Sequence, residues 1–105
     1  MDKLIESFTD LIDGASEVEL RCETGTTGVT RINVTAVHWE CEWNMSSGPY
    51  MPERRLGFAK PAEAEDALAR MRKTLDERGY RKDCTACSID EFNHRWSHEY
   101  YSYKD

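Results

Sequence analysis

Hydrophobic and polar positions repeat with two different periods along this chain, and each period predicts its own kind of element. Between residues 2 and 13 the apolar side chains recur three and four positions apart, which is typical of a helix with one buried face. A second stripe begins after Pro61 and ends before Gly79, and it predicts a longer helix. The stripes contain Leu4, Ile5, Phe8, Leu11 and Ile12 in the first helix, and Ala64, Ala67, Leu68, Met71 and Leu75 in the second.

The outward side of the second helix carries charges four positions apart. Side chains at this spacing are neighbours on a helix surface, so opposite charges there form ion pairs. We expect this side to be a solvated face. The expected pairs are Asp66 with Arg70, Arg72 with Asp76, and Lys73 with Glu77.

A period of two marks the segments that we expect to be strands. Residues 17–23 alternate strictly between apolar and charged side chains, as in a half-buried strand. The two glycines within residues 24–28 indicate a hairpin loop. Residues 29–44 are rich in β-branched and aromatic side chains, but their alternation changes phase near Ala36, which predicts a bulge, a bend or two tightly joined strands. Residues 53–58 are expected to add a short edge strand.

Two cysteines and two histidines near the C-terminus have the order and outer spacing of zinc ligands. Cys84, Cys87, His94 and His98 form the pattern C-x2-C-x6-H-x3-H. The central gap is about half the length usual between the two ligand pairs of a zinc finger. The pattern therefore keeps a zinc-stabilised interaction module as an alternative.

The conformation of residues 88–103 decides between the two interpretations of this segment. A capping box at Ser88–Glu91 and an apolar helical face favour a helix, in which both histidines reach one ion. The aromatic content favours a strand, in which the histidines lie about 13 Å apart and cannot share an ion. We expect a strand at 93–103, and hence no metal or other cofactor.

Together these elements predict one α+β domain that spans residues 1–105. Its antiparallel sheet should have about four strands, with two helices packed on one face. A length of 105 residues fits a single domain, and 39% hydrophobic with 32% charged residues fits one modest core under a solvated surface.

The charge balance narrows the choice of partners. Twenty acidic and 14 basic residues give a formal net charge of −6, which repels nucleic acid and anionic membranes but attracts a basic protein. The chain shows no secretory signal pattern and no apolar run of about 18 residues. We therefore expect a cytoplasmic protein whose four cysteines are free thiols.

No catalytic constellation is complete in the sequence. Cys84 or Cys87 with His94 could form a thiolate pair, and the two cysteines could form a redox pair, but the sequence offers no third group at a recognisable spacing. We therefore expect a protein that is not an enzyme, and keep a cysteine-dependent redox or nucleophilic enzyme as an alternative.

Acidic and aromatic residues on the predicted strands favour a protein-binding function. If the strands are neighbours, their outward glutamates crowd one surface, and a basic partner would relieve the repulsion. Tryptophan and tyrosine often anchor interfaces. By analogy with small acidic inhibitors and immunity proteins, we expect a module that neutralises a basic protein; a merely solvated face over an aromatic core is the plain alternative. The candidate partner-binding residues are Glu17, Glu19, Glu23, Glu40, Glu42, Trp43, Tyr50, Tyr101 and Tyr103.

Overall fold

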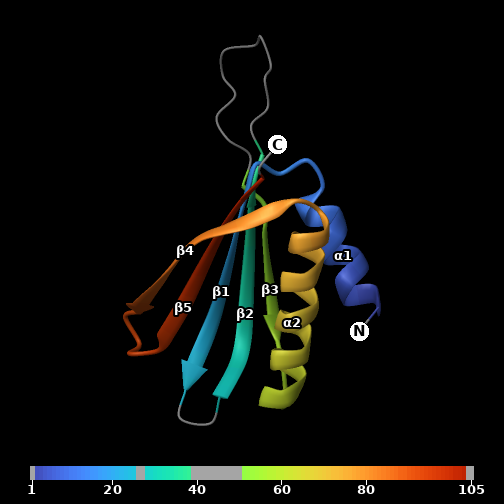
Figure 1. Ribbon diagram of the computed structural model, residues 1–105. Helices are drawn as coiled ribbons and strands as arrows, with labels where there is room; N and C mark the ends of the chain where they lie inside the picture. The colour runs from blue at the N-terminus through green and yellow to red at the C-terminus, as the bar shows by residue number, and fades with distance from the viewer. Residues whose placement is uncertain (1, 26–27, 39–50, 104–105) are drawn as a thin grey trace.

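Among the residues that the structure describes, five strands form one antiparallel sheet, and both helices lie against the same face of it (Figure 1). The computed structural model describes residues 2–25, 28–38 and 51–103. The strand order is β3-β2-β1-β5-β4, and every neighbouring pair is antiparallel. In these residues the elements are α1 (Asp2–Ile12), β1 (Glu17–Gly25), β2 (Gly28–Val37), β3 (Glu53–Gly57), α2 (Pro61–Glu77), β4 (Tyr80–Ile89) and β5 (Arg95–Tyr103).

Both helices form where the apolar stripes predict them, and the stripes face the core. In α1, Phe8 and Ile12 are buried, and the remaining apolar residues of the stripe are partly buried against the core. All five stripe residues of α2 are buried. Gly14 and Gly79, which follow the two helices, adopt φ values of 79° and 90°, a left-handed conformation in which glycine has no Cβ strain.

The hairpin of β1 and β2 supplies the centre of the sheet. The ladder continues to Gly25 opposite Gly28, so the predicted hairpin is confirmed. The phase change predicted near Ala36 falls at the end of β2, and residues 39–44 lie outside the described residues. The buried pairs of this ladder are Val18 with Ala36, Leu20 with Val34, and Cys22 with Ile32.

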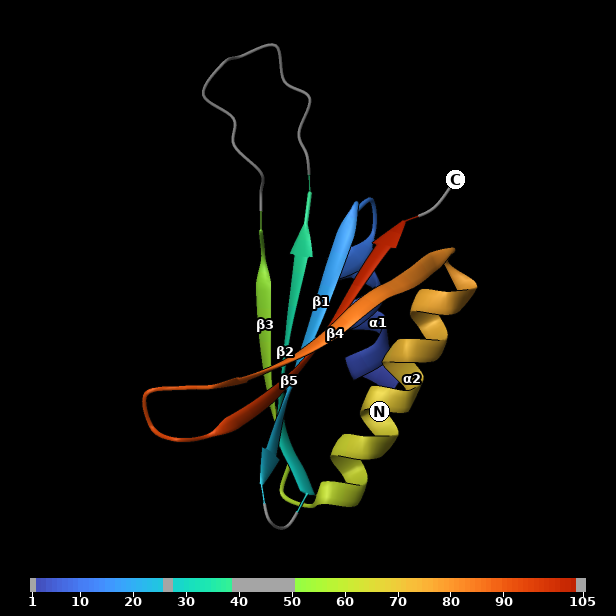
Figure 2. The ribbon, with the colours of Figure 1, turned by 60° about the vertical axis from the view of Figure 1, so that its left-hand side comes forward.

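The C-terminal segment forms two strands. The expected strand at 93–103 is confirmed as β5, which pairs with β1 on one side and with β4 on the other. The prediction of about four strands was too low because it gave no strand to residues 80–89. Every residue of β4 from Arg81 to Ile89 is exposed, and the far end of the β4–β5 hairpin projects beyond the helices (Figure 2).

A buried charged network fixes α2 to the sheet. Glu99 of β5 points to the helix side and is only 3% exposed. The Arg72 guanidinium donates two hydrogen bonds to its carboxylate, one of them 2.9 Å long, and Tyr101 Oη donates another at 2.6 Å. Burial acts to raise the pKa of Glu99, but these bonds and the nearby cations outweigh it and hold the pKa below its usual range.

The predicted pairing of Arg72 with Asp76 is therefore wrong. Arg72 reaches across to the sheet, and Asp76 lies 3.6 Å from Arg81 instead. The other two expected pairs of α2 are present, at 3.1 Å for Asp66 with Arg70 and 4.0 Å for Lys73 with Glu77.

Candidate functional site

The sheet face opposite the helices carries the candidate site. Strand residues alternate between two faces, so the side chains that do not enter the core point to this second face, which we call the open face. None of the described helices lies on it (Figure 2). Its side chains include Glu17, Glu19, Arg21 and Glu23 of β1, Arg31, Asn33, Thr35 and Val37 of β2, and Trp96, His98, Tyr100 and Ser102 of β5.

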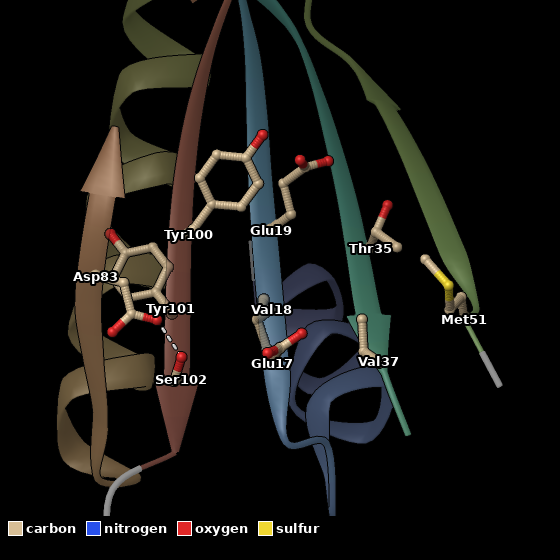
Figure 3. Close-up of a pocket in the computed structure, with 10 residues that line it drawn as sticks. All are labelled: Glu17, Val18, Glu19, Thr35, Val37, Met51, Asp83, Tyr100, Tyr101 and Ser102. Carbon is tan, nitrogen blue, oxygen red and sulfur yellow. Dashed lines mark hydrogen bonds between the residues drawn. The ribbon is translucent and has the colours of Figure 1, made fainter. Parts of the chain in front are cut away.

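A hollow of about 250 Å³ lies at one end of the open face (Figure 3). We call it the acidic hollow, because three carboxylates stand around it; the remaining lining is mostly apolar, together with the hydroxyl-bearing side chains of Thr35 and Ser102. Four strands contribute to it, so its shape rests on backbone ladders. The carboxylates are those of Glu17, Glu19 and Asp83, and the main apolar contributors are Val37, Met51 and the ring of Tyr100.

The three carboxylates of the acidic hollow differ in how far they are already neutralised. Glu19 lies 3.4 Å from Arg21 Nε and 3.5 Å from His98 Nδ1. Asp83 accepts a hydrogen bond from the hydroxyl of Ser102. Glu17 is exposed, and its carboxylate forms neither a hydrogen bond nor an ion pair with the described residues. Glu17 is thus the carboxylate most available to a ligand.

Tyr100 connects the apolar and acidic parts of the hollow. Its ring stacks near His98, with centroids 6.1 Å apart and an interplanar angle of 11°. Burial, together with the neighbouring Glu19 carboxylate, raises the pKa of the Tyr100 hydroxyl. The hydroxyl therefore stays protonated at neutral pH and can donate a hydrogen bond.

The other end of the open face has balanced charge. Two guanidinium groups lie near the ring of Trp96, with Arg31 5.2 Å and Arg21 5.8 Å from its centroid, as in cation–π contacts. Arg31 also forms an ion pair with Glu23, and Trp96 Nε1 donates a 3.0 Å hydrogen bond to Asp90. Since arginines offset the carboxylates here, the acidic excess of the face is concentrated at the hollow.

The structure places the candidate partner-binding residues in three different settings. Glu17, Glu19 and Glu23 share the open face, and the partners of Glu17 and Glu19 across β2 are Val37 and Thr35. The expected crowding with Glu40 and Glu42 falls outside the described residues. Tyr101 lies on the helix side, 7% exposed, and Tyr103 is 50% exposed at the end of β5. The remaining candidates, Glu40, Glu42, Trp43 and Tyr50, lie outside the described residues.

The four residues of the possible zinc site are not brought together. Cys84 pairs with Tyr100 and Cys87 with Ser97, so the two cysteines point to opposite faces of β4. His98 Nε2 lies 2.6 Å from the hydroxyl of Ser88. Within the described ranges, no group of three His, Cys, Asp or Glu side chains is placed to hold a metal ion. The geometry of the segment thus gives the zinc alternative no support.

One row of side chains has the order of a catalytic triad. Ser88, His98 and Glu19 follow one another as hydroxyl, imidazole and carboxylate, at 2.6 and 3.5 Å. Ser88 does not line the acidic hollow, so a substrate held there would not meet this hydroxyl. We interpret this row of side chains as a structural contact that links β4, β5 and β1.

Seven of the ten residues that line the acidic hollow were missed from the sequence, among them Tyr100, Asp83 and Met51. Tyr100 follows Trp96 and His98 at a spacing of two, which was the available signal that it shares their face. Asp83 occupies a bulge in β4, between the paired residues Lys82 and Cys84. Met51 comes from the segment before β3, and only the register brings it to the hollow.

No protein-family model, curated protein or solved structure matches this chain. Neither helix in the described part of the chain combines the length and apolar character needed to cross a bilayer.

Proposed function

We propose that this chain is a non-catalytic protein-binding module that captures a basic segment of a partner protein in the acidic hollow. The observation that carries this proposal is the combination of three carboxylates with an apolar lining. Lysine and arginine side chains have an apolar stem and a charged head, so they match both parts of such a site. Strands hold the hollow, which limits the ordering cost of binding.

The charge distribution supports the same kind of partner. The net charge of −6 steers a basic protein towards the chain, and the acidic excess of the open face lies at the hollow. Glu17 is expected to contribute most, because it has no partner among the described residues that the ligand must displace. In its narrower form, the proposal is that the module inhibits a basic protein, as immunity-type proteins do.

Charge reversal at Glu17 tests the proposal. Oligoarginine serves as the probe, with affinity measured by isothermal titration calorimetry at low and at physiological salt. We expect Glu17→Lys to weaken binding about tenfold, which corresponds to about 1.4 kcal/mol, because it replaces an attractive charge in the hollow by a repulsive one. The weakening should be smaller at the higher salt concentration.

A matched control separates the hollow from the overall charge. Glu65 is exposed on α2, on the helix side of the molecule, and Glu65→Lys changes the net charge from −6 to −4, as Glu17→Lys does. We expect the control to weaken binding less than about twofold. Equal losses in the two variants, or no binding of oligoarginine to the unaltered chain, would contradict the proposal. A basic protein encoded next to this chain is the first natural partner to test.

A further inference from the structure

The outer edge of β4 is a long backbone edge with no partner among the described strands. Native edge strands usually carry charges, bulges or proline that block further pairing. The opposite edge follows this rule, because β3 has only five residues and three of them are charged. In β4 the bulge and all the charges lie before Cys84, and the six residues from Cys84 to Ile89 are uncharged and exposed.

The hydrogen-bond pattern shows which backbone groups of β4 are directed outward. The backbone N–H of Asp90 donates to the carbonyl of His94, 2.9 Å away, so Asp90 faces β5. Successive residues of a strand direct their backbone groups to alternate sides, and the register from Cys84 to Ile89 is unbroken. The N–H and C=O groups of Thr85, Cys87 and Ile89 therefore point away from the sheet.

Charged residues flank this uncharged stretch with opposite signs. Arg81, Lys82 and Asp83 precede it with a net charge of +1, and Asp90 and Glu91 follow it with a charge of −2. A strand with this pattern is complementary to an antiparallel copy of itself, because the basic start of one strand meets the acidic end of the other. We propose that β4 pairs with β4 of a second copy of this chain about a twofold axis at Ala86.

The proposed register follows from the charges and the outward backbone groups. An axis at Ala86 places Thr85 opposite Cys87 of the second copy, and both residues have outward N–H and C=O groups. It also brings Arg81 and Lys82 to the end of the contact where Asp90 and Glu91 of the second copy lie. Moving the axis by one residue to Cys87 keeps outward groups opposite each other but separates these charges. The charges thus select the first register.

Pairing at this edge would join two five-stranded sheets into one continuous antiparallel sheet. The contact is isologous, so it closes at two copies and leaves β3 as the edge on each side. Glu17 and Glu19 stand on β1, inside the sheet, whereas the third carboxylate of the hollow, Asp83, belongs to β4 itself. The two proposals are tested separately, because a monomer that binds oligoarginine would overturn only the dimer.

A proline at an outward position tests the pairing without breaking the β4–β5 ladder. Thr85→Pro removes an N–H that points away from β5, and edge positions of this kind tolerate proline. Sedimentation equilibrium of the full chain under reducing conditions should give twice the 12.2 kDa chain mass for the unaltered protein and for Thr85→Val. Thr85→Pro should weaken dimerisation at least about tenfold. Circular dichroism checks that its fold is retained.

A charge swap provides a second test that does not alter the backbone. Arg81→Glu and Glu91→Arg should each weaken the dimer, and the double variant should restore it, because the opposed charges are exchanged. Restoration distinguishes this antiparallel contact from general charge effects. A monomeric unaltered chain, a dimer that persists in folded Thr85→Pro, or a double variant that stays as weak as the single variants would overturn the proposal.

Discussion

Replacing Arg72 by alanine tests the buried network that fixes α2 to the sheet. The change removes two hydrogen bonds from the Glu99 carboxylate, which is 3% exposed. Tyr101 Oη, at 2.6 Å, and Lys82 Nζ, at 3.8 Å, remain beside it. The variant thus leaves a buried negative charge with only part of its compensation.

The expected loss follows from the burial of the two partners. Removing one partner of a fully buried ion pair costs about 3–5 kcal/mol. Here the side chain of Arg72 is 48% exposed, and Lys82 still faces the carboxylate, so solvent and the second cation reduce the penalty. We expect Arg72→Ala to lower the free energy of unfolding by about 2–3 kcal/mol at neutral pH.

The loss should depend on pH in a defined direction. In the unaltered chain the folded-state pKa of Glu99 is lowered, so its contribution is present above the unfolded-state pKa and is lost as the pH falls through the folded-state pKa. In Arg72→Ala burial acts with less opposition, and Glu99 takes up a proton at a higher pH. The difference between the two proteins should therefore shrink as the pH falls from neutral to about 4.

Urea denaturation followed by tryptophan fluorescence measures these differences. Arg70→Ala is the matched control, because Arg70 lies on the same helix and its ion pair with Asp66 is exposed on both sides. It should cost less than about 0.5 kcal/mol from the pair itself. Adding Glu99→Gln to Arg72→Ala should recover part of the loss, since no charge stays buried. Equal losses in the two alanine variants, or a loss that does not change with pH, would refute the reasoning.

Two further predictions concern the buried polar groups of the core. Tyr80→Phe should lower the free energy of unfolding, measured by urea denaturation, by about 1–3 kcal/mol. The buried hydroxyl donates to the carbonyls of Ile12, at 3.0 Å, and Ala15, at 2.6 Å, and an unchanged free energy of unfolding would contradict these bonds. Cys22 should resist alkylation at neutral pH in the folded chain, because burial raises its pKa to about 11. The two exposed cysteines of β4 should react. Peptide mass spectrometry measures the labelling of each cysteine, and rapid labelling of Cys22 would contradict its burial.

The sequence predicted the elements whose burial alternates. Both helices and the strands β1 and β5 lie close to the expected positions, because their buried side chains recur with the period of the element. β3 also lies close to its expected position, although four of its five residues are exposed. β4 had no such signal, because its residues from Arg81 onward are exposed on both faces. Neither face is buried, so polar and apolar residues need not alternate along the strand. The pairing of Arg72 was also hidden, because Glu99 is distant in sequence and only packing brings the two together.

Only part of the candidate site could be predicted from the sequence. The glutamates of β1 could be assigned to an outward face from their alternation alone, and that assignment agrees with the sheet. The acidic hollow also needs the register of four strands and the bulge at Asp83, which no local pattern encodes. Tyr101 was a candidate for contact with a partner from its residue type, but its position in the β5 alternation puts it in the core.

The central place of β1 constrains the order of folding. On one side it pairs with β2, which follows it directly, but on the other it needs β5, so that Glu17 meets Ser102. During synthesis β1 is therefore exposed along one side until the ribosome has released β5. The sheet closes late and through distant contacts, which are slow to form. Until then, only the helices and β2 can pack against β1.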